Sequence, residues 1–184
     1  MKTLPLKFQW LDKIPVDTLP KLWIENRKHY GVLETPGTAN TPEIMSWAKE
    51  FGASGYYKLD SIPWCGLYAC VPMGRAGYRN LIPRDPLAAK SWNGVGVSVP
   101  KGMEMFMDVL VFSRPGGNHV GYYIAENKTH FLVYGGNTAD SVGFAWIEKT
   151  RLQYAGRIAY NNQPKAIKKY FLEIGSDKVS TNEV

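Results

Sequence analysis

The sequence predicts a single α+β domain in which helices come first and an antiparallel sheet of about five strands follows. A chain of 184 residues can bury one sizeable core but is short for two. Apolar side chains recur at helical spacing in the first third of the chain, whereas short β-branched and aromatic runs fill the second half. Helices followed by a run of strands are typical of the α+β class.

Two helices are expected in the first part of the chain. The first lies over residues 20–30, between Pro20 and Gly31, where apolar and aromatic side chains recur at helical spacing. The second begins with Thr41 as its N-cap and Pro42 at its first helical position, because both residue types are favoured at those places. This helix is expected to end near Gly52.

A third, short helix is expected over residues 61–70. Asp60 or Ser61 would cap it, and Pro63 would lie in its first turn. This arrangement places Cys65 at or near the N-terminus of a helix.

The strands are the evenly spaced runs of the second half, which we expect to pair as an antiparallel meander. They cover residues 106–113, 119–125, 130–134, 142–147 and 155–160. We divide the chain into an N-terminal extension over 1–19, a domain over 20–160 and a tail over 161–184. The tail has room for one short helix around 165–174 before a polar, frayed end.

Composition and charge narrow the classes of function. Apolar residues make up 45% of the chain, which excludes disorder for the bulk of it. The net charge of +6 favours an anionic partner or simply serves solubility, and residues 74–103 carry much of it. No run approaches the roughly 18 apolar residues that span a bilayer. Lys7 and Gln9 interrupt any signal-peptide core, so we expect a protein made in the cytoplasm without membrane insertion.

The chain has two cysteines, Cys65 and Cys70, which are too few for a disulfide scaffold. On one helix their axial separation would be roughly 7.5 Å, which is poorly suited to a bridge. Their spacing and the scattered histidines do not match a zinc site. We therefore expect no metal and no cofactor.

Cys65 is the candidate nucleophile. The thiolate is the reactive form, and the positive end of a helix dipole together with a nearby imidazole lowers the pKa of a thiol. The competing interpretation is a small buried apolar residue, as most free cysteines are. Cys70 lacks the position at the helix end, and we assign it to the core.

His119 is the candidate general base. It follows a flexible turn and opens a strand, where a rigid scaffold can present a base. His29 lies beside charged residues of a helix and is expected at the surface, and His130 begins a strand in an ordinary hairpin. A third group usually orients the imidazole, and Asn137, after the next strand, can lie at the same end of the sheet. A structural histidine and a plain Gly-Gly-Asn turn are the alternatives.

Several motifs occur in an order that resembles a known family. They are Tyr-Lys-Leu-Asp-Ser-Ile-Pro-Trp-Cys (57–65), Ala-Lys-Ser-Trp (89–92), Met-Asp-Val-Leu-Val-Phe (107–112), Asn-His-Val-Gly-Tyr-Tyr (118–123) and Gly-Gly-Asn (135–137). The sequence is similar to the NlpC and CHAP superfamily of cysteine, histidine-dependent amidohydrolases and peptidases, and within it to a branch found in phage lysins and bacterial cell-wall hydrolases. The segment 30–37 fits this branch as well, so the resemblance covers roughly residues 20–160.

The resemblance implies a papain-like fold in which the nucleophile helix packs on the antiparallel sheet. It implies that Cys65 is the nucleophile, His119 the base and Asn137 the residue that orients the ring. Peptide or amide bonds of peptidoglycan would be the substrate, cleaved by a monomer. One departure is Gly135, which stands where many CHAP domains have a Glu.

The same resemblance has consequences for substrate binding and for delivery. Four residues near the two motifs are candidate substrate-binding residues, although buried aromatics, Tyr122 included, are more often core. They are Tyr57, Asp60, Trp64 and Trp92. The oxyanion would be met by the Cys65 backbone N–H and a second donor near residues 60–64. Without a signal peptide, a wall hydrolase would need release by a holin-like partner, or delivery by a virion or a secretion machine.

Two other classes stay open at this point. A glycosidase-type muramidase would use two carboxylates, such as Glu34 and Asp60. A non-catalytic wall or nucleic-acid binder is favoured by the charge, but the aromatics lack the basic interleaving of a nucleic-acid motif, so we expect no nucleic-acid partner. The sequence does not tell whether the bond cut is N-acetylmuramoyl–L-Ala, a stem-peptide link or a crossbridge.

Overall fold

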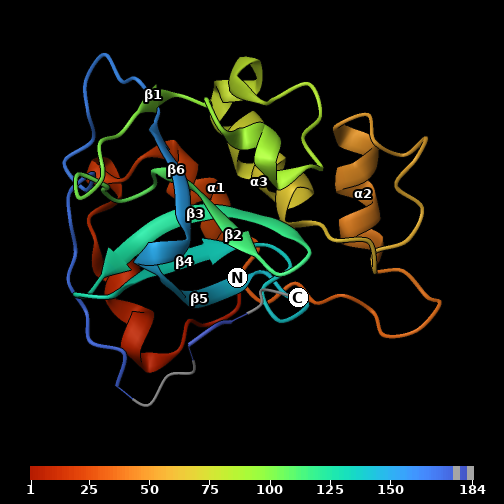
Figure 1. Cartoon of the computed structure of the whole chain (residues 1–184), viewed down its shortest axis with the longest axis horizontal. Helices are drawn as coiled ribbons and strands as arrows, with labels where there is room; N and C mark the ends of the chain where they lie inside the picture. Colours follow the sequence, from red (N-terminus) through yellow and green to blue (C-terminus); the bar gives the residue numbers. More distant parts are fainter. Residues whose placement is uncertain (176–178, 182–184) are drawn as a thin grey trace.

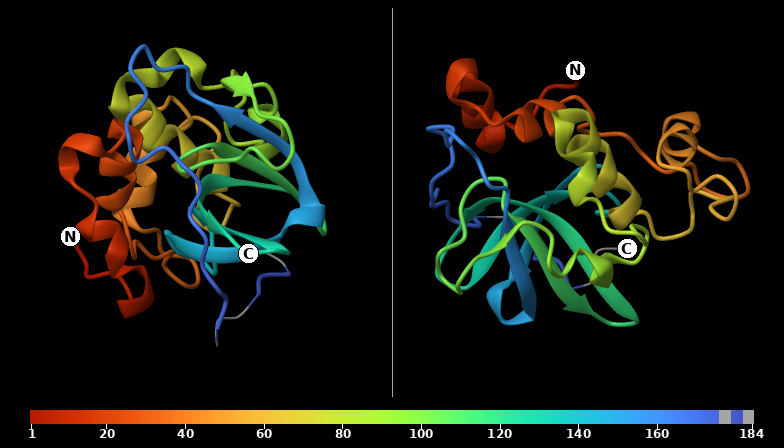
Figure 2. Two further views of the ribbon diagram at one scale, coloured as in Figure 1. Left: turned by 90° about the vertical axis from the view of Figure 1, so that its left-hand side faces the viewer. Right: turned by 90° about the horizontal axis from the view of Figure 1, so that it is seen from above.

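A computed structural model describes residues 1–175 and 179–181, and it confirms the α+β class. Helices gather on one side of the molecule and a twisted antiparallel sheet forms the other (Figure 1). The view from above in Figure 2 shows α3 between the sheet and the more peripheral α2. The helices are α1 (Lys21–Arg27), α2 (Pro42–Glu50) and α3 (Cys65–Met73).

The first two helices match the sequence prediction, with Thr41 at the N-cap of α2 and Pro42 at its first position. Residues 1–19, expected as an extension, form two 3₁₀ helices, Leu6–Lys13 and Val16–Thr18. This segment contributes Leu4, Phe8 and Leu11 to the main hydrophobic core. It is therefore part of the packed domain.

The third helix begins at Cys65 itself, four residues later than predicted. Neither Asp60 nor Ser61 caps it, because Trp64 occupies the N-cap position and no side chain bonds there. The helix also runs past Pro72. A π turn, Gly74–Tyr78, and a 3₁₀ turn, Arg79–Leu81, continue it, as expected where a proline removes a helical hydrogen bond.

The sheet has six strands in the order β1-β6-β2-β3-β4-β5. They are β1 (Val97–Ser98), β2 (Val109–Arg114), β3 (Gly117–Glu126), β4 (His130–Gly135), β5 (Gly143–Glu148) and β6 (Leu152–Arg157). Strands β2 to β5 form the predicted meander. The last strand differs from the prediction, because it pairs with β2 and not with β5. Only the turn Lys149–Arg151 joins β5 to β6, so the sheet must curl to bring its two sides together.

Two cores follow from this curl. The main core lies between the helices and one face of the sheet, where the Tyr122 hydroxyl donates to the Ala69 carbonyl in α3 at 2.7 Å. A smaller cluster fills the opposite face. It consists of Leu110, Phe112, Tyr123, Phe131, Val133, Ala145, Ile147 and Ala155.

The predicted helix around 165–174 is absent among the described residues of the tail, which form turns, bends and isolated bridges. Instead of bonding to one another as in a helix, backbone groups of the tail form hydrogen bonds with backbone groups of the main domain. Ala166 donates to the Thr18 carbonyl, and the Glu126 amide donates to the Tyr170 carbonyl. Part of the expected frayed end lies outside the described residues. Within the described ranges, no helix is long and apolar enough to cross a membrane.

His29, predicted at the surface, is buried between three segments. Its Nδ1 lies 2.9 Å from Glu43 Oε1 in α2, and its Nε2 lies 2.9 Å from Nη1 of Arg75. Because guanidinium only donates, Nε2 accepts and the proton sits on Nδ1. Burial lowers the pKa of His29, and the charge of Arg75 acts in the same direction although Glu43 opposes it. A neutral imidazole thus links α1, α2 and the turn after α3.

The neutral state of His29 makes stability depend on pH. As the pH falls through about 6.5, the unfolded chain takes up a proton that the folded protein resists, so the free energy of unfolding decreases. We expect His29→Asn to lower it by about 1–3 kcal/mol at pH 7.5 and to flatten its fall between pH 7 and 5. Urea unfolding at several pH values measures both effects. The matched variant His130→Asn leaves His29 in place and should keep the wild-type slope, and an equally steep slope in His29→Asn would contradict the assignment.

Candidate active site

The N-terminus of α3 brings Cys65 to the end of strand β4. Cys65 is the first residue of the helix and is only 3% exposed. The first amides of a helix have no intrahelical acceptor, so they remain available to other groups. The amides of Cys65 and Gly66 both lie close to the thiol and lower its pKa.

A third amide, that of Val120 in β3, also bonds to the Cys65 thiol. Tyr123 donates its amide to Asp108 on the β2 side, so the amides of Val120 and Tyr122 point toward β4. Strand β4 ends at Gly135, and the register places Gly135 opposite Gly121, the residue that follows Val120. The Val120 amide therefore has no strand partner, and the thiol takes that place.

Opposing effects act on the thiol. Burial raises the pKa of Cys65, and the three amides together with the positive charge of Arg114 lower it, with burial prevailing. The closed site consequently favours the neutral thiol. Formation of a thiolate needs a proton acceptor close by.

His119 precedes Val120 and is fully buried. The side chain of Val120 belongs to the main core, so the alternation of the strand directs His119 to the other face of the sheet. The ring leans toward β4, since its Nε2 lies 3.5 Å from the point where a Cβ on Gly135 would stand. Cys65 therefore approaches the end of β4 from the side of α3, and the His119 ring lies beside the same strand end on the other face of the sheet.

The absence of a side chain at Gly135 leaves room for the His119 ring. Any side chain longer than a methyl group at this position would compete with the imidazole. The glycine that departs from the family pattern is therefore compatible with the placement of His119.

Asn137 lies two residues beyond the end of β4 and is buried in a left-handed conformation, with φ of 54°. Its side chain makes no hydrogen bond within the part of the chain that the structure describes. The structure places it near the strand end but shows no contact with the imidazole. Its role in orienting His119 stays a prediction.

Trp64 and Asp60 hold the segment 34–41 against the start of α3. The Trp64 indole donates to Glu34 Oε2 at 3.0 Å. The Asp60 carboxylate accepts the amides of Thr35 and Thr41 at 3.1 and 2.7 Å. Burial raises the pKa of Glu34, opposed by the Trp64 bond, and the charges of Asp140 and Asp60 raise it further. The two acids of the glycosidase alternative are thus neighbours, but Asp60 is buried and bonded to backbone.

The other two candidate substrate-binding residues, Tyr57 and Trp92, are also buried. The Tyr57 hydroxyl donates to the Ile62 carbonyl at 3.2 Å, and the Trp92 indole donates to the Pro86 carbonyl at 3.0 Å. These bonds fix the two loops on either side of Cys65. In this structure the four residues hold the loops around Cys65 in place. Their contact with substrate stays a prediction.

Sequence reasoning did not single out Val120, Gly66 or Arg114, although all three act on the thiol. An amide leaves no signal in the side-chain pattern. Gly135 and Gly136 were the available signal. Two adjacent glycines at the end of a strand can indicate that another segment packs closely there, but the pattern was interpreted as a turn. Among the described residues, no cluster of three metal-binding side chains occurs.

No protein-family model matches this sequence, and a search of curated proteins finds no match either.

Substitution of Gly66 tests how tightly the loop at Pro86 and Leu87 covers the start of α3. A Cβ there would lie 2.1 Å from the Pro86 carbonyl oxygen and 2.8 Å from that of Leu87. A helical Gly→Ala change normally stabilises by about 0.5–1 kcal/mol, but this clash should reverse the sign. We expect Gly66→Ala to destabilise the protein by about 1–3 kcal/mol in thermal unfolding.

The matched control is Gly55→Ala, because a Cβ at Gly55 meets nothing within 4 Å. It should change the free energy of unfolding by less than about 0.5 kcal/mol. Equal effects of the two substitutions would show that the loop does not press on α3.

Proposed function

We propose that this protein is a peptidoglycan hydrolase of the NlpC/CHAP type, with a papain-like fold, which cleaves an amide or peptide bond by Cys–His thiol catalysis. One observation carries the proposal. Cys65 is the first residue of α3, and a backbone amide that acts on its thiol belongs to Val120, the residue after His119. The ordered motifs of the sequence support it. Backbone amides beside the sulfur lower the pKa of the thiol, which suits a nucleophile.

The reaction begins with transfer of the Cys65 proton to His119. The thiolate attacks the carbonyl carbon, and the negative oxygen that forms is stabilised by backbone amides at the N-terminus of α3. The imidazolium gives its proton to the leaving nitrogen as the C–N bond breaks, which leaves a thioester on Cys65. His119 then takes a proton from water, the hydroxide attacks the thioester, and the C–S bond breaks to release a carboxylic acid.

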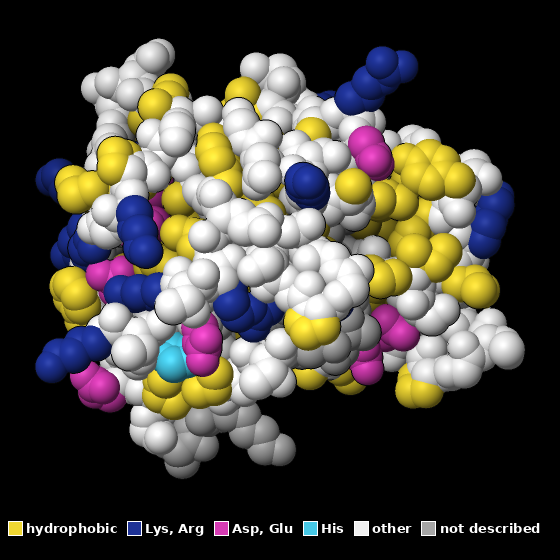
Figure 3. Space-filling view, viewed as in Figure 1, with side chains coloured by type: hydrophobic (Ala, Val, Ile, Leu, Met, Phe, Trp, Pro, Cys, Tyr) yellow, Lys and Arg dark blue, Asp and Glu magenta, His cyan; other side chains and the backbone are white. Residues whose placement is uncertain are grey.

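The surface beside α3 offers a place for the substrate. Four large apolar side chains are exposed in the segments that meet Trp64 and Glu34. They are Leu33, Tyr56, Leu59 and Ile62. Figure 3 shows hydrophobic side chains gathered on the part of the surface over α2 and the segment that follows it. Peptidoglycan presents alanine methyl groups and sugar faces, which such a surface can contact.

Delivery to the wall belongs to the same proposal. A hydrolase of this type reaches peptidoglycan after release by a holin-like partner, or with a virion or a secretion machine. The positive net charge of +6 suits an anionic envelope polymer.

Replacement of Cys65 tests the nucleophile. We expect Cys65→Ala and Cys65→Ser to reduce release of soluble fragments from purified peptidoglycan below detection. His119→Ala should reduce it by about 100-fold or more. The matched control is Cys70→Ala, because burial raises the pKa of the Cys70 thiol to about 12 and its Sγ bonds to the Gly66 carbonyl at 3.4 Å.

Cys70→Ala should retain hydrolysis, with circular dichroism verifying that each variant is folded. Mass spectrometry of the released muropeptides identifies the bond, since new amino groups indicate an amidase or peptidase and new reducing ends a glycosidase. Hydrolysis that persists in a folded Cys65→Ala variant would exclude the proposed mechanism.

A further inference from the structure

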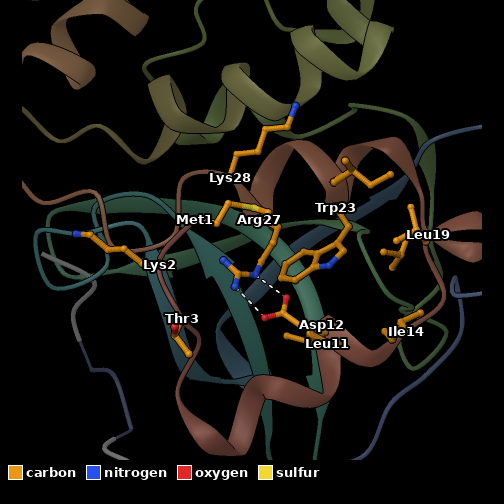
Figure 4. Close-up of a pocket in the computed structure, with 12 residues that line it drawn as sticks. Met1, Lys2, Thr3, Leu11, Asp12, Ile14, Leu19, Trp23, Arg27 and Lys28 are labelled. Atoms are coloured by element: carbon orange, nitrogen blue, oxygen red, sulfur yellow. Dashed lines mark hydrogen bonds and ion pairs between the residues drawn. The ribbon is translucent and has the colours of Figure 1, made fainter.

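A cavity of about 530 Å³ lies between the N-terminal 3₁₀ segments and α1, and neither Cys65 nor His119 lines it (Figure 4). Its size is within the range of small-molecule binding sites. Most of its wall is apolar, with a single ion pair at one side. The apolar lining consists of Leu11, Ile14, Val16, Leu19, Trp23 and Ile24, with Met1 at the edge.

The ion pair joins Arg27 to Asp12. Arg27 Nε and Nη2 donate to the two carboxylate oxygens at 2.7 and 2.8 Å. Arg27 is 9% exposed, and its remaining nitrogen, Nη1, has no hydrogen-bond partner within the described residues. In Figure 4 this nitrogen points away from Asp12, toward the space beside Met1 and Lys2. A buried donor without an acceptor costs about 1–3 kcal/mol, so an acceptor supplied by a ligand would be favoured here.

The charges around the cavity favour an anion. Arg27, Lys2 and Lys28 line it, against the single carboxylate of Asp12. The Lys2 ammonium donates to the Gly31 carbonyl, and Lys28 pairs with Glu25 at 2.7 Å on the exposed side of α1. Asp12 balances Arg27 and Glu25 balances Lys28, so Lys2 supplies the excess positive charge at the cavity wall.

We propose that this cavity is a binding site for an aliphatic carboxylate. One carboxylate oxygen accepts a hydrogen bond from Arg27 Nη1, and the aliphatic part lies on the apolar wall formed by Ile14, Val16 and Leu19. A charge-assisted bond of this kind is stronger than one between neutral groups. The ligand is either a free medium-chain fatty acid or the C-terminus of a peptide with an apolar last residue, since both present the same chemistry.

Titration of the full chain with octanoate, followed by two-dimensional amide NMR, tests the site. We expect shifts confined to residues 1–3 and 11–28. Binding should be at least about tenfold tighter than that of 1-octanol, which has the same chain without the charge. N-acetyl-leucyl-leucine, with its free carboxylate, is the second probe. Tighter binding of the dipeptide identifies a peptide C-terminus, and tighter binding of octanoate identifies a fatty acid.

Three substitutions and one control locate the interaction. Arg27→Met should weaken octanoate binding about tenfold or more. Because Arg27 is buried, the second variant is Val16→Glu, at a residue 72% exposed, which should repel the carboxylate without disturbing the fold. Lys28→Gln should weaken binding severalfold, and its matched control Lys21→Gln, in the same helix but outside the lining, should not. Equal affinity for 1-octanol, or unchanged octanoate binding in both Arg27→Met and Val16→Glu, would overturn the proposal.

Discussion

The backbone of Gly136 packs directly against α3, and the position of this helix on the sheet depends on that approach. A Cβ at Gly136 would stand 2.4 Å from the Tyr68 Cβ and 2.7 Å from the Trp64 ring. Only a residue without a side chain lets the strand end come so near. Tyr122, bonded to the Ala69 carbonyl, holds the following turn of the helix at the same spacing. The contact thereby fixes where Cys65 meets β3.

The end of β4 does the rest of the positioning. Because that strand stops at Gly135, an amide of β3 is left without a strand partner and bonds to the thiol. The imidazole of His119 occupies the space that Gly135 leaves beside the same strand end. Two glycines and one strand terminus therefore build the arrangement on which the proposed chemistry depends, and the side chains around it serve mainly to hold the loops in place.

The predictable parts of the structure were those set by local pattern. Helix spacing and the Thr41–Pro42 signal located α2, and alternating strands located β2 to β5. The start of α3 was predicted too early because the Asp60 carboxylate bonds to amides far away in sequence, at Thr35 and Thr41. The pairing of β6 with β2 depends on the curl of the whole sheet, and the course of the tail depends on hydrogen-bond partners in other segments. Neither leaves a local signal.

The burial of Cys65 also bears on how long such an enzyme would survive outside a reducing compartment. Oxidants and alkylating reagents attack the exposed thiolate, and sulfenic acid formation follows the same rule. Cys65 is only 3% exposed and burial raises the pKa of its thiol, so it offers little of either property. The closed arrangement would therefore protect the proposed nucleophile from oxidation in aerated surroundings.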